Sequence, residues 1–315
     1  MVALLLAAVA ASCATAQLQE KFYSKSCPSV EEVVRKEMVR ALSLAPSLAA
    51  PLLRMHFHDC FGCDGSVLLD SANKTAEKDA LPNQTLRGFD FVERVKAAVE
   101  KACPDTVSCA DVLTLIARDA SKGPFWEVPL GRRDGSVSIS NETDALPPPT
   151  ANITVLTQLF AAKNLDIKDL VVLSAAHTIG TSHCFSFSDR LYNFTGRVNP
   201  SDIDPTLEPF YMAKLKSKCA SLNDNTTLVE MDPGSFKTFD LDYFKLVSKR
   251  RGLFHSDGAL LTNAFTRAYI QRHATGAFKD EFFADFAVSM VKMGNANVLT
   301  GSQGEIRKKC SVVNH

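Results

Sequence analysis

Residues 54–63 read RMHFHDCFGC and bring an arginine, two histidines, an aspartate and two cysteines into one short stretch. The apolar spacing of residues 47–59 predicts a helix, which places Arg54 and His58 one turn apart on the same face with Phe57 beside them. Such a face offers a fixed cation, an imidazole and an apolar wall, which suits proton transfer with stabilisation of a developing charge. Taken alone, the stretch is explained equally well by a histidine buried for structural reasons.

Helical spacing of apolar residues extends over most of the chain. We expect helices over residues 29–44, 47–59, 87–101, 108–121, 153–163, 165–179, 206–220, 241–248, 264–272 and 278–293. Ser108 can cap the start of its helix, and Asp166 or Asp169 lies near the start of the 165–179 helix. Alternating strand patterns are scarce, so the sequence predicts an all-α fold.

The N-terminal sequence indicates secretion. Residues 2–16, VALLLAAVAASCATA, form an apolar run that ends in small residues like those of a signal cleavage site. We expect a signal peptide over residues 1–16 and a mature chain from Gln17. At roughly fifteen residues the run is too short to span a bilayer, and we expect no later membrane-spanning segment.

Cysteine usage and sequons fit the same compartment. Of the nine cysteines, Cys13 lies in the leader, and the remaining even number suits four disulfides. Six N-x-Ser/Thr sequons fit a glycosylated secreted chain: Asn73, Asn83, Asn141, Asn152, Asn193 and Asn225. With 35 basic and 35 acidic side chains, no field exists to attract nucleic acid or an acidic membrane, so small neutral partners are expected.

A second histidine lies in LSAAHTIG, residues 173–180, where small residues before His177 would let a flat group such as haem approach closely. Further along, RGLFHSD places Asp257 in what reads as a polar turn. A histidine that binds haem iron needs its other ring N–H anchored, usually by a carboxylate. The sequence alone does not pair Asp257 with His177, and a surface aspartate and a structural histidine explain the same residues.

Together these segments resemble the secreted plant haem peroxidases, class III of the plant peroxidase superfamily, from Gln17 to Asn314. The resemblance rests on motifs in the same order: FYSKSCP at Phe22, LLRMHFHDC at Leu52, EKDALPN at Glu77, VSCADVL at Val107, PLGRRDG at Pro129, LSAAHTIG at Leu173, FHSDGALL at Phe254 and MVKMGNANVLTGSQGEIRKKC at Met290. It implies one peroxidase domain over residues 17–315, with helical halves on the two sides of a haem.

The resemblance also implies roles for the reactive residues. His58 would move the peroxide proton, Arg54 would stabilise the charge that develops as the O–O bond breaks, and Asn83 would hold the other N–H of His58. The remaining roles are Glu77 in support of that network, Phe57 in the wall, His177 as axial iron ligand, Asp257 as its carboxylate partner, Pro147 near the docking site of aromatic donors, and His56 as a structural residue. Because Asn83 would be buried against His58, we predict that its sequon is not glycosylated.

The implied cofactors are haem b, non-covalent because C-x-x-C-H is absent, and two calcium ions. The implied disulfides are Cys27 with Cys103, Cys60 with Cys63, Cys109 with Cys310 and Cys184 with Cys219, and Asp111 and Arg132 match a buried ion pair of the family. The proximal calcium ligands would be Thr178, Asp232, Ser235, Asp240 and the carbonyl of Thr238. The distal ligands would be Asp59, Gly62, Asp64 and Ser66.

The distal calcium loop departs from the family pattern. Only Phe61 and Gly62 separate Cys60 from Cys63, where the family normally has four residues, so one backbone ligand has no counterpart. We predict a weakened or absent distal calcium. The resulting C-x-x-C spacing also occurs in redox-active pairs.

Three other interpretations remain open at this point. His56, His58 and Asp59 could bind zinc in a hydrolase, although such ligands would be expected on a strand. The chain could be a C-x-x-C thiol oxidoreductase, although its other six cysteines do not suit that class. It could also be a secreted glycoprotein that keeps the fold without the activity.

For the peroxidase we expect hydrogen peroxide and small phenolic donors such as lignin precursors as substrates, a monomer, and secretion to the cell wall or apoplast.

Overall fold

The computed structural model describes residues 17–60, 62–197, 199 and 201–314. The predicted signal peptide, residues 1–16, lies outside the described residues. The helices are α1 (Val30–Leu44), α2 (Ala49–Asp59), α3 (Phe89–Ala102), α4 (Cys109–Ser121), α5 (Ile153–Ala161), α6 (Ile167–Ser174), α7 (Asp189–Tyr192), α8 (Pro209–Lys218), α9 (Asp242–Ser248), α10 (His255–Ala259), α11 (Ala264–His273) and α12 (Lys279–Gly294).

Every helix that the sequence predicts has a counterpart, and the all-α prediction is confirmed. The additions are several short 3-10 helices, the short helices α7 and α10, and one antiparallel pair of strands, β1 (Thr181–His183) and β2 (Leu228–Glu230). The predicted 165–179 helix is divided, because α6 ends at Ser174 and a 3-10 turn, Ala175–Thr178, follows it. His177 therefore sits on a tighter turn at the end of α6.

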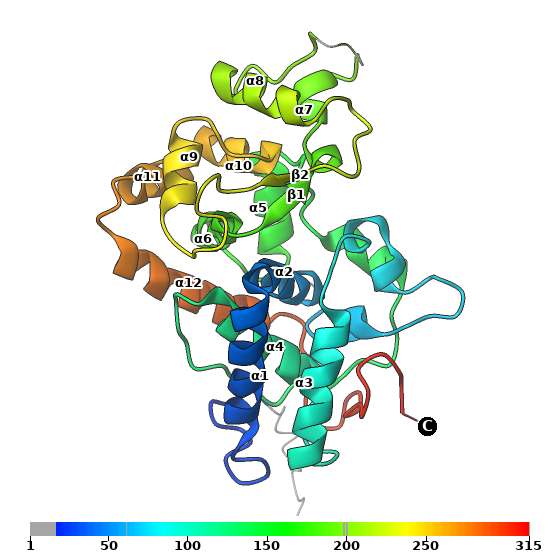
Figure 1. Ribbon diagram of the computed structural model, residues 1–315. Helices are drawn as coiled ribbons and strands as arrows, with labels where there is room; N and C mark the ends of the chain where they lie inside the picture. The colour runs from blue at the N-terminus through cyan, green and yellow to red at the C-terminus, as the bar shows by residue number, and fades with distance from the viewer. Residues whose placement is uncertain (1–16, 61, 198, 200, 315) are drawn as a thin grey trace, which may run out of the picture.

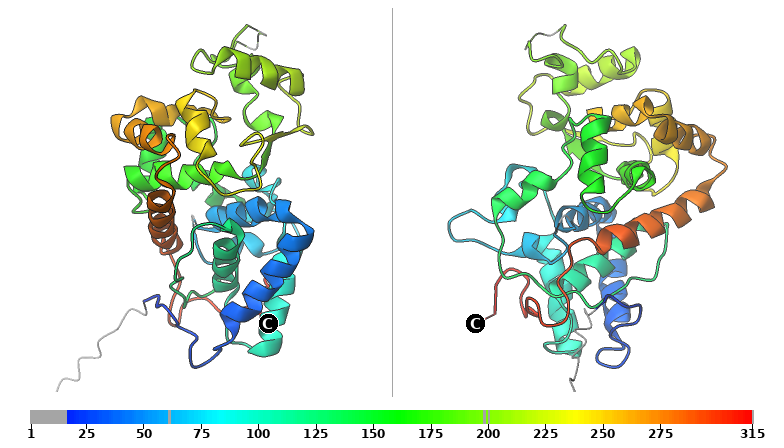
Figure 2. Two further views of the ribbon diagram at one scale, coloured as in Figure 1. Left: turned by 60° about the vertical axis from the view of Figure 1, so that its left-hand side comes forward. Right: turned by 180° about the vertical axis from the view of Figure 1, so that it is seen from behind.

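The helices form two groups (Figure 1). Helices α1 to α4 make the lower half of the molecule, and α5, α6 and α9 to α11 make the upper half, with α7 and α8 at its outer end. Figure 2 shows the same division from two further sides, with the C-terminal segment lying along the lower half. Helix α2 is the part of the lower half that borders the upper one.

Helix α4 forms the centre of the lower half. Apart from Asp119, all of its residues are buried, including the charged Asp111 and Arg118. Ser108 caps it, because its hydroxyl accepts the backbone N–H of Asp111 at 3.1 Å. The buried Asp111 carboxylate pairs with Arg132 at 2.8 Å and accepts the Tyr23 hydroxyl at 2.8 Å. These contacts hold α4 to the N-terminal segment and to the chain before Asp134.

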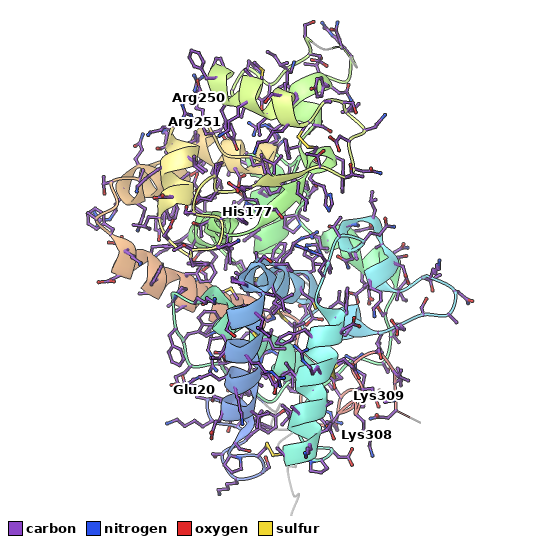
Figure 3. All side chains as sticks on the ribbon, in the orientation of Figure 1. Glu20, His177, Arg250, Arg251, Lys308 and Lys309 are labelled. Atoms are coloured by element: carbon purple, nitrogen blue, oxygen red, sulfur yellow. A yellow bond between two sulfur atoms is a disulfide. The ribbon has the colours of Figure 1, made fainter. Side chains whose placement is uncertain are left out.

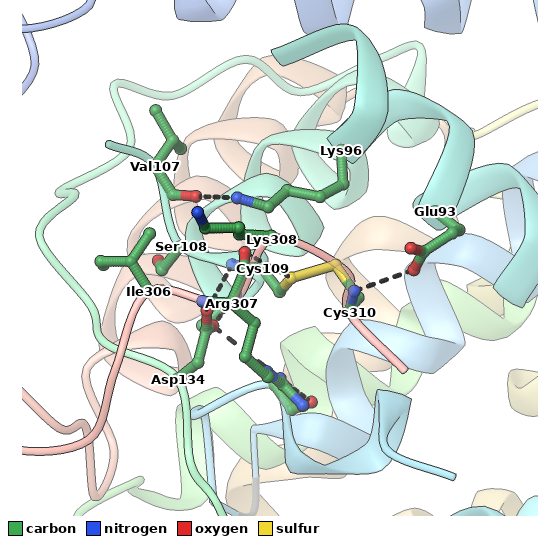
Figure 4. The surroundings of a disulfide bond; sticks show 12 residues. Glu93, Lys96, Val107, Ser108, Cys109, Asp134, Ile306, Arg307, Lys308 and Cys310 are labelled. Carbon is green, nitrogen blue, oxygen red and sulfur yellow. Dashed lines mark hydrogen bonds and ion pairs between the residues drawn. A yellow bond between two sulfur atoms is a disulfide. The ribbon is translucent and has the colours of Figure 1, made fainter. Parts of the chain in front are cut away.

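The described residues form four disulfides, and their pairs are those that the family resemblance implies: Cys27–Cys103, Cys60–Cys63, Cys109–Cys310 and Cys184–Cys219. All but Cys60–Cys63 join segments that are distant in the sequence. The Cys109–Cys310 bond ties the start of α4 to the C-terminal segment (Figure 4). Beside it, the Asp134 carboxylate accepts hydrogen bonds from the backbone N–H groups of Cys109 at 3.0 Å and Arg307 at 2.8 Å.

None of the helices in the described part of the chain has the length and hydrophobicity needed to span a bilayer.

Candidate active site

On α2, the orientation of the His58 ring is fixed by the residue that its Nδ1 contacts. The Asn83 amide nitrogen donates to the backbone carbonyl of Glu77 at 2.8 Å, which leaves the amide oxygen as the acceptor. That oxygen lies 2.5 Å from His58 Nδ1, so Nδ1 carries the proton. His58 Nε2 is then unprotonated and carries a lone pair, as a proton acceptor requires.

Arg54 lies beside this lone pair, as the one-turn spacing on α2 predicts. Its Nε donates to His58 Nε2 at 3.1 Å, its Nη1 to the Thr85 hydroxyl at 2.9 Å and its Nη2 to the Pro82 carbonyl at 2.8 Å. Thr85 and Pro82 were not identified from the sequence, because no motif links them to an arginine 31 and 28 residues earlier. They hold the guanidinium where it faces His58.

Burial and charge keep this pair in its working protonation state. Burial, together with the nearby Arg54 cation, lowers the pKa of His58 to about 3, so the imidazole is neutral at neutral pH. Burial and the Arg87 charge lower the pKa of Arg54 to about 10, which leaves it cationic. A neutral base therefore faces a positive charge.

His56 faces the other way from this pair. It is 1% exposed, its Nδ1 lies 3.4 Å from Cys60 Sγ, and burial and Arg132 lower its pKa to about 3. Within the described residues, no group of three or more His, Cys, Asp or Glu side chains is arranged to hold a metal ion. With His56 and His58 on a helix, the geometry gives no support to the zinc-hydrolase interpretation.

The His177 ring is anchored by a buried carboxylate. His177 Nδ1 lies 2.8 Å from Asp257 Oδ1, which also accepts the Tyr243 hydroxyl at 2.9 Å. The other carboxylate oxygen accepts the backbone N–H of Phe254 at 2.8 Å. Burial opposes the charge of Asp257, but His177 and these hydrogen bonds outweigh it and lower its pKa.

The prediction that Asp257 lies in a polar turn is wrong. Asp257 is 1% exposed and belongs to the short helix α10, where its carboxylate caps the first turn through the Phe254 N–H. The segment HSDGA lacks the apolar periodicity that identifies longer helices, so its sequence reads as a turn. Tyr243 was also not identified from the sequence, since its role depends only on its contact with Asp257.

The two histidines come from the two halves of the molecule. Figure 3 shows His177 in the upper half, whereas His58 lies on α2. The halves are closely packed near Gly180, where a Cβ atom would lie 2.8 Å from the Cβ of Ala50 on α2, and the φ of +104° also favours glycine. Phe57 packs edge-on against His58 with ring centroids 5.5 Å apart.

Pro147 is half-buried and precedes a segment that is bonded to α10. The carbonyl of Pro149 accepts the N–H of Ser256 at 2.9 Å, and the carbonyl of Thr150 lies 2.8 Å from His255 Nδ1. The chain after Pro147 is thereby fixed to the helix that carries Asp257. A surface hollow of about 480 Å³ between α1 and Phe125 contains none of these residues.

Oxygen-bearing side chains gather next to His177. The Thr178 hydroxyl lies 3.0 Å from Asp232 Oδ2 and 3.2 Å from Asp240 Oδ1. Burial raises the pKa of Asp232 to about 6, and the nearby Asp240 charge adds to this effect. Hydrogen bonds from the Thr178 and Ser235 hydroxyls oppose it. Two carboxylates and hydroxyls held this closely are the ligands that calcium prefers.

A second group of oxygens lies at the end of α2. Asp59 is buried, and one of its carboxylate oxygens has no hydrogen-bond partner among the described residues. Burial and the Asp64 charge raise the pKa of Asp59 to about 8. The Ser66 hydroxyl donates to Glu77 at 2.5 Å, and its N–H donates to Asp64 at 3.1 Å. The group thus has an unpaired oxygen that a cation could contact.

Comparison with known proteins identifies the family. A sequence profile described as peroxidase matches residues 34–276. Peroxidase 1 of Oryza sativa subsp. japonica is 81% identical over 320 residues, which cover 100% of this chain and 98% of that protein. The chain belongs to the plant peroxidase family. Peroxidase 3 of Arabidopsis thaliana is 58% identical over 95% of this chain and 93% of that protein, and Arabidopsis Peroxidase 30 is 57% identical over 94% and 91%.

The protein is therefore an enzyme, a haem peroxidase of the class III plant group, as the sequence motifs predict. The family in general uses haem and calcium, reduces hydrogen peroxide and is secreted. The peroxidase has a donor that fits haem iron, because Asp257 holds Nδ1 of His177 and leaves Nε2 available. The oxygens around Thr178 fit calcium, and those around Asp59 fit it less fully because the loop between the cysteines is short.

Proposed function

We propose that this peroxidase uses His58 to move the peroxide proton and His177 to bind the iron of haem b non-covalently. One observation carries the proposal: each histidine has its Nδ1 held by a partner, Asn83 or Asp257, which leaves its Nε2 unprotonated. The Nε2 of His58 faces the Arg54 guanidinium at 3.1 Å. Haem bound at His177 would supply the electrons that reduce peroxide and would recover them one at a time from a phenolic donor.

In the proposed sequence, His58 acts first as a base and then as an acid. Its neutral Nε2 accepts a proton from one oxygen of hydrogen peroxide, while Nδ1–H stays bonded to Asn83. The same nitrogen then donates that proton to the departing oxygen, which leaves as water. Arg54, beside Nε2, stabilises the negative charge on that oxygen. The proton transfer by His58 contributes about two to four orders of magnitude in rate, and the Arg54 charge about two to three.

The supporting residues keep these groups in place. Glu77 holds the Asn83 amide through its carbonyl, Phe57 forms the apolar wall beside His58, and Asp257 makes His177 a more electron-rich ligand. A proximal calcium held by Thr178, Asp232, Ser235, Thr238 and Asp240 would fix the turn that carries His177. Distal calcium, at Asp59, Gly62, Asp64 and Ser66, would be bound weakly or not at all.

The donors proposed are small phenolics, such as lignin precursors and wall phenolics, which approach near Pro147. The proposal also includes removal of residues 1–16, a single peroxidase domain over residues 17–315, a monomeric enzyme and secretion to the cell wall or apoplast. The apolar leader, the even number of remaining cysteines and the four disulfides support this location.

Absorbance of the haem-loaded protein tests the site. We expect a Soret band that shifts when peroxide is added and returns when guaiacol, a methoxyphenol, is added. His58→Leu should keep the Soret band but react with peroxide about 10² to 10⁴ times more slowly. His177→Gly should lose the axial ligand, and added imidazole should restore part of the spectrum.

The control is His183→Gln, since His183 lies on β1 and stacks on Phe185 without contacting either histidine's partner. It should leave both the spectrum and the peroxide reaction unchanged. An unaltered peroxide rate in His58→Leu would refute the role of His58, and an unaltered axial ligand in His177→Gly would refute that of His177.

A further inference from the structure

Arg190 in α7 is a buried arginine outside the residues assigned above. It is 2% exposed, and its Nε donates at 2.8 Å to Asp204, which is 1% exposed. Asp204 in turn accepts the hydroxyl of Thr206 at 2.6 Å. A buried pair of this kind is stable only when its remaining donors and acceptors are also satisfied.

A second nitrogen of the Arg190 guanidinium, Nη1, contacts three successive backbone carbonyls. Its Nη1 lies 2.7 Å from the oxygen of Gly252, 2.9 Å from that of Leu253 and 2.9 Å from that of Phe254. One cation thus draws the carbonyls of residues 252–254 together, through hydrogen bonds strengthened by its charge.

These carbonyls belong to the segment that leads into α10. Phe254 donates its N–H to Asp257 at 2.8 Å and packs its ring edge-on against His177 at 5.0 Å. The segment therefore contacts both members of the His177–Asp257 pair, and a shift of its backbone would alter the acceptor geometry of Asp257.

The segment is also closely packed against Asp257 and Arg190. A Cβ atom on Gly252 would lie 2.5 Å from the Cβ of Asp257, and one on Gly258 would lie 3.3 Å from Nη2 of Arg190. The guanidinium and the Asp257 side chain thus lie against the same short stretch of backbone, residues 252–258.

We propose that Arg190, held by Asp204, is a positioning residue that fixes residues 252–257 so that Asp257 stays hydrogen-bonded to His177. The inference rests on the proposed role of His177 as iron ligand. Its consequence is that a side chain in the outer helix α7, which contacts neither histidine, sets how strongly Asp257 withdraws the proton of His177.

The test compares Arg190→Gln with a matched control, Arg118→Gln. Arg118 is also buried and paired with two carboxylates, Glu31 and Asp119, but it lies in α4 away from α10. Asp257→Asn shows the full effect of weakening the hydrogen-bond partner of His177. Arg190→Lys and Asp204→Asn replace Arg190→Gln in the comparison if that variant does not fold.

The first measurement is the Fe–His stretching frequency of the ferrous, haem-loaded protein. Arg190→Gln should lower it toward the value of Asp257→Asn, Arg190→Lys should recover part of the shift, and Arg118→Gln should leave it unchanged. The second is hydrogen exchange of residues 252–260 in the haem-free protein, which should be about tenfold faster in Arg190→Gln than in Arg118→Gln.

The results distinguish a failure of the Arg190 inference from a failure of the proposed pairing of His177 with Asp257. If Asp257→Asn shifts the frequency while a folded Arg190→Gln, or Asp204→Asn in its place, leaves both readouts at wild-type values, Arg190 has no positioning role. If Asp257→Asn itself causes no shift, the proposed pairing of His177 with Asp257 at the iron is wrong and the inference falls with it.

Discussion

Asn83 and Thr85 are the first and third residues of a glycosylation sequon, yet both are used inside the molecule. Asn83 is 1% exposed and holds His58, and the Thr85 hydroxyl accepts Arg54. Asn83 and Thr85 therefore have separate structural roles, and their spacing of two residues produces the sequon. By contrast, Asn73, Asn141 and Asn225 are exposed.

We predict that Asn83 carries no glycan, because its amide is buried between His58 and the Glu77 carbonyl and leaves no space for a sugar on the nitrogen. The measurement is peptide mapping by mass spectrometry of the protein secreted from plant cells. The exposed asparagines, such as Asn73, provide the internal control for glycosylation in the same sample. Detection of glycan at Asn83 would contradict its assigned contact with His58.

Removal of the Arg54 charge should shift the acid limit of the peroxide reaction. Burial and the Arg54 cation hold the pKa of His58 at about 3, and only the neutral ring accepts a proton. Without the cation the imidazolium is less disfavoured, so the pKa rises and activity is lost at a higher pH as the solution is acidified.

The expected result for Arg54→Leu is therefore an acid limb displaced toward neutral pH and a peroxide reaction slower by about 10² to 10³. Stopped-flow rates measured across the acid range provide the test. Arg54→Lys retains a charge and should keep the acid limb closer to its wild-type position. An acid limb in Arg54→Leu that coincides with that of the wild type would exclude this electrostatic role.

At the scale of secondary structure, the proximal turn and the end of α2 differ in how well they can hold calcium. Thr178 and two carboxylates converge beside His177, whereas the distal group has only Phe61 and Gly62 between its cysteines. We predict one tightly bound calcium ion per chain by metal analysis of the purified protein. Two tightly bound ions would contradict the effect assigned to the short loop.

Two substitutions assign that ion to its site. Asp240→Asn should remove it and lower the thermal stability, because the carboxylate is lost from the proximal group. Asp59→Asn should leave the tight ion bound, and chelation should destabilise the wild type and Asp59→Asn alike. Loss of the tight ion from Asp59→Asn instead would place it at the distal site.

The same elements show what the sequence can predict. Helix α4 was predicted because it is long, apolar and preceded by a capping serine, and the Arg54–His58 pair because four residues on a helix share a face. The five-residue α10 and the three-residue strands have no periodicity to recognise. The paired residues are far apart in the sequence, 25 residues for His58 and Asn83 and 80 residues for His177 and Asp257. Local sequence patterns therefore could not pair them, and only the family resemblance did so without the structure.

At the scale of the whole molecule, the disulfides differ in the length of chain that they close. Cys109 and Cys310 are separated by 201 residues, and their bond joins the start of α4 to the C-terminal segment. Cys60 and Cys63 are separated by three residues. In the chain-entropy treatment, the stabilisation from a crosslink grows with the length of the loop that it closes in the unfolded chain.

We predict that Cys109→Ala together with Cys310→Ala lowers the free energy of unfolding by about 5 kcal/mol, and that Cys60→Ala together with Cys63→Ala lowers it by about 2 kcal/mol. Guanidinium unfolding of the haem-free proteins measures both, and the short-loop variant controls for the loss of two buried sulfur atoms. The Asp134 contacts to Cys109 and Arg307 remain in the long-loop variant, so its native fold should persist. Equal losses in the two variants would show that local packing at the disulfides, rather than restriction of the unfolded chain, determines their contribution.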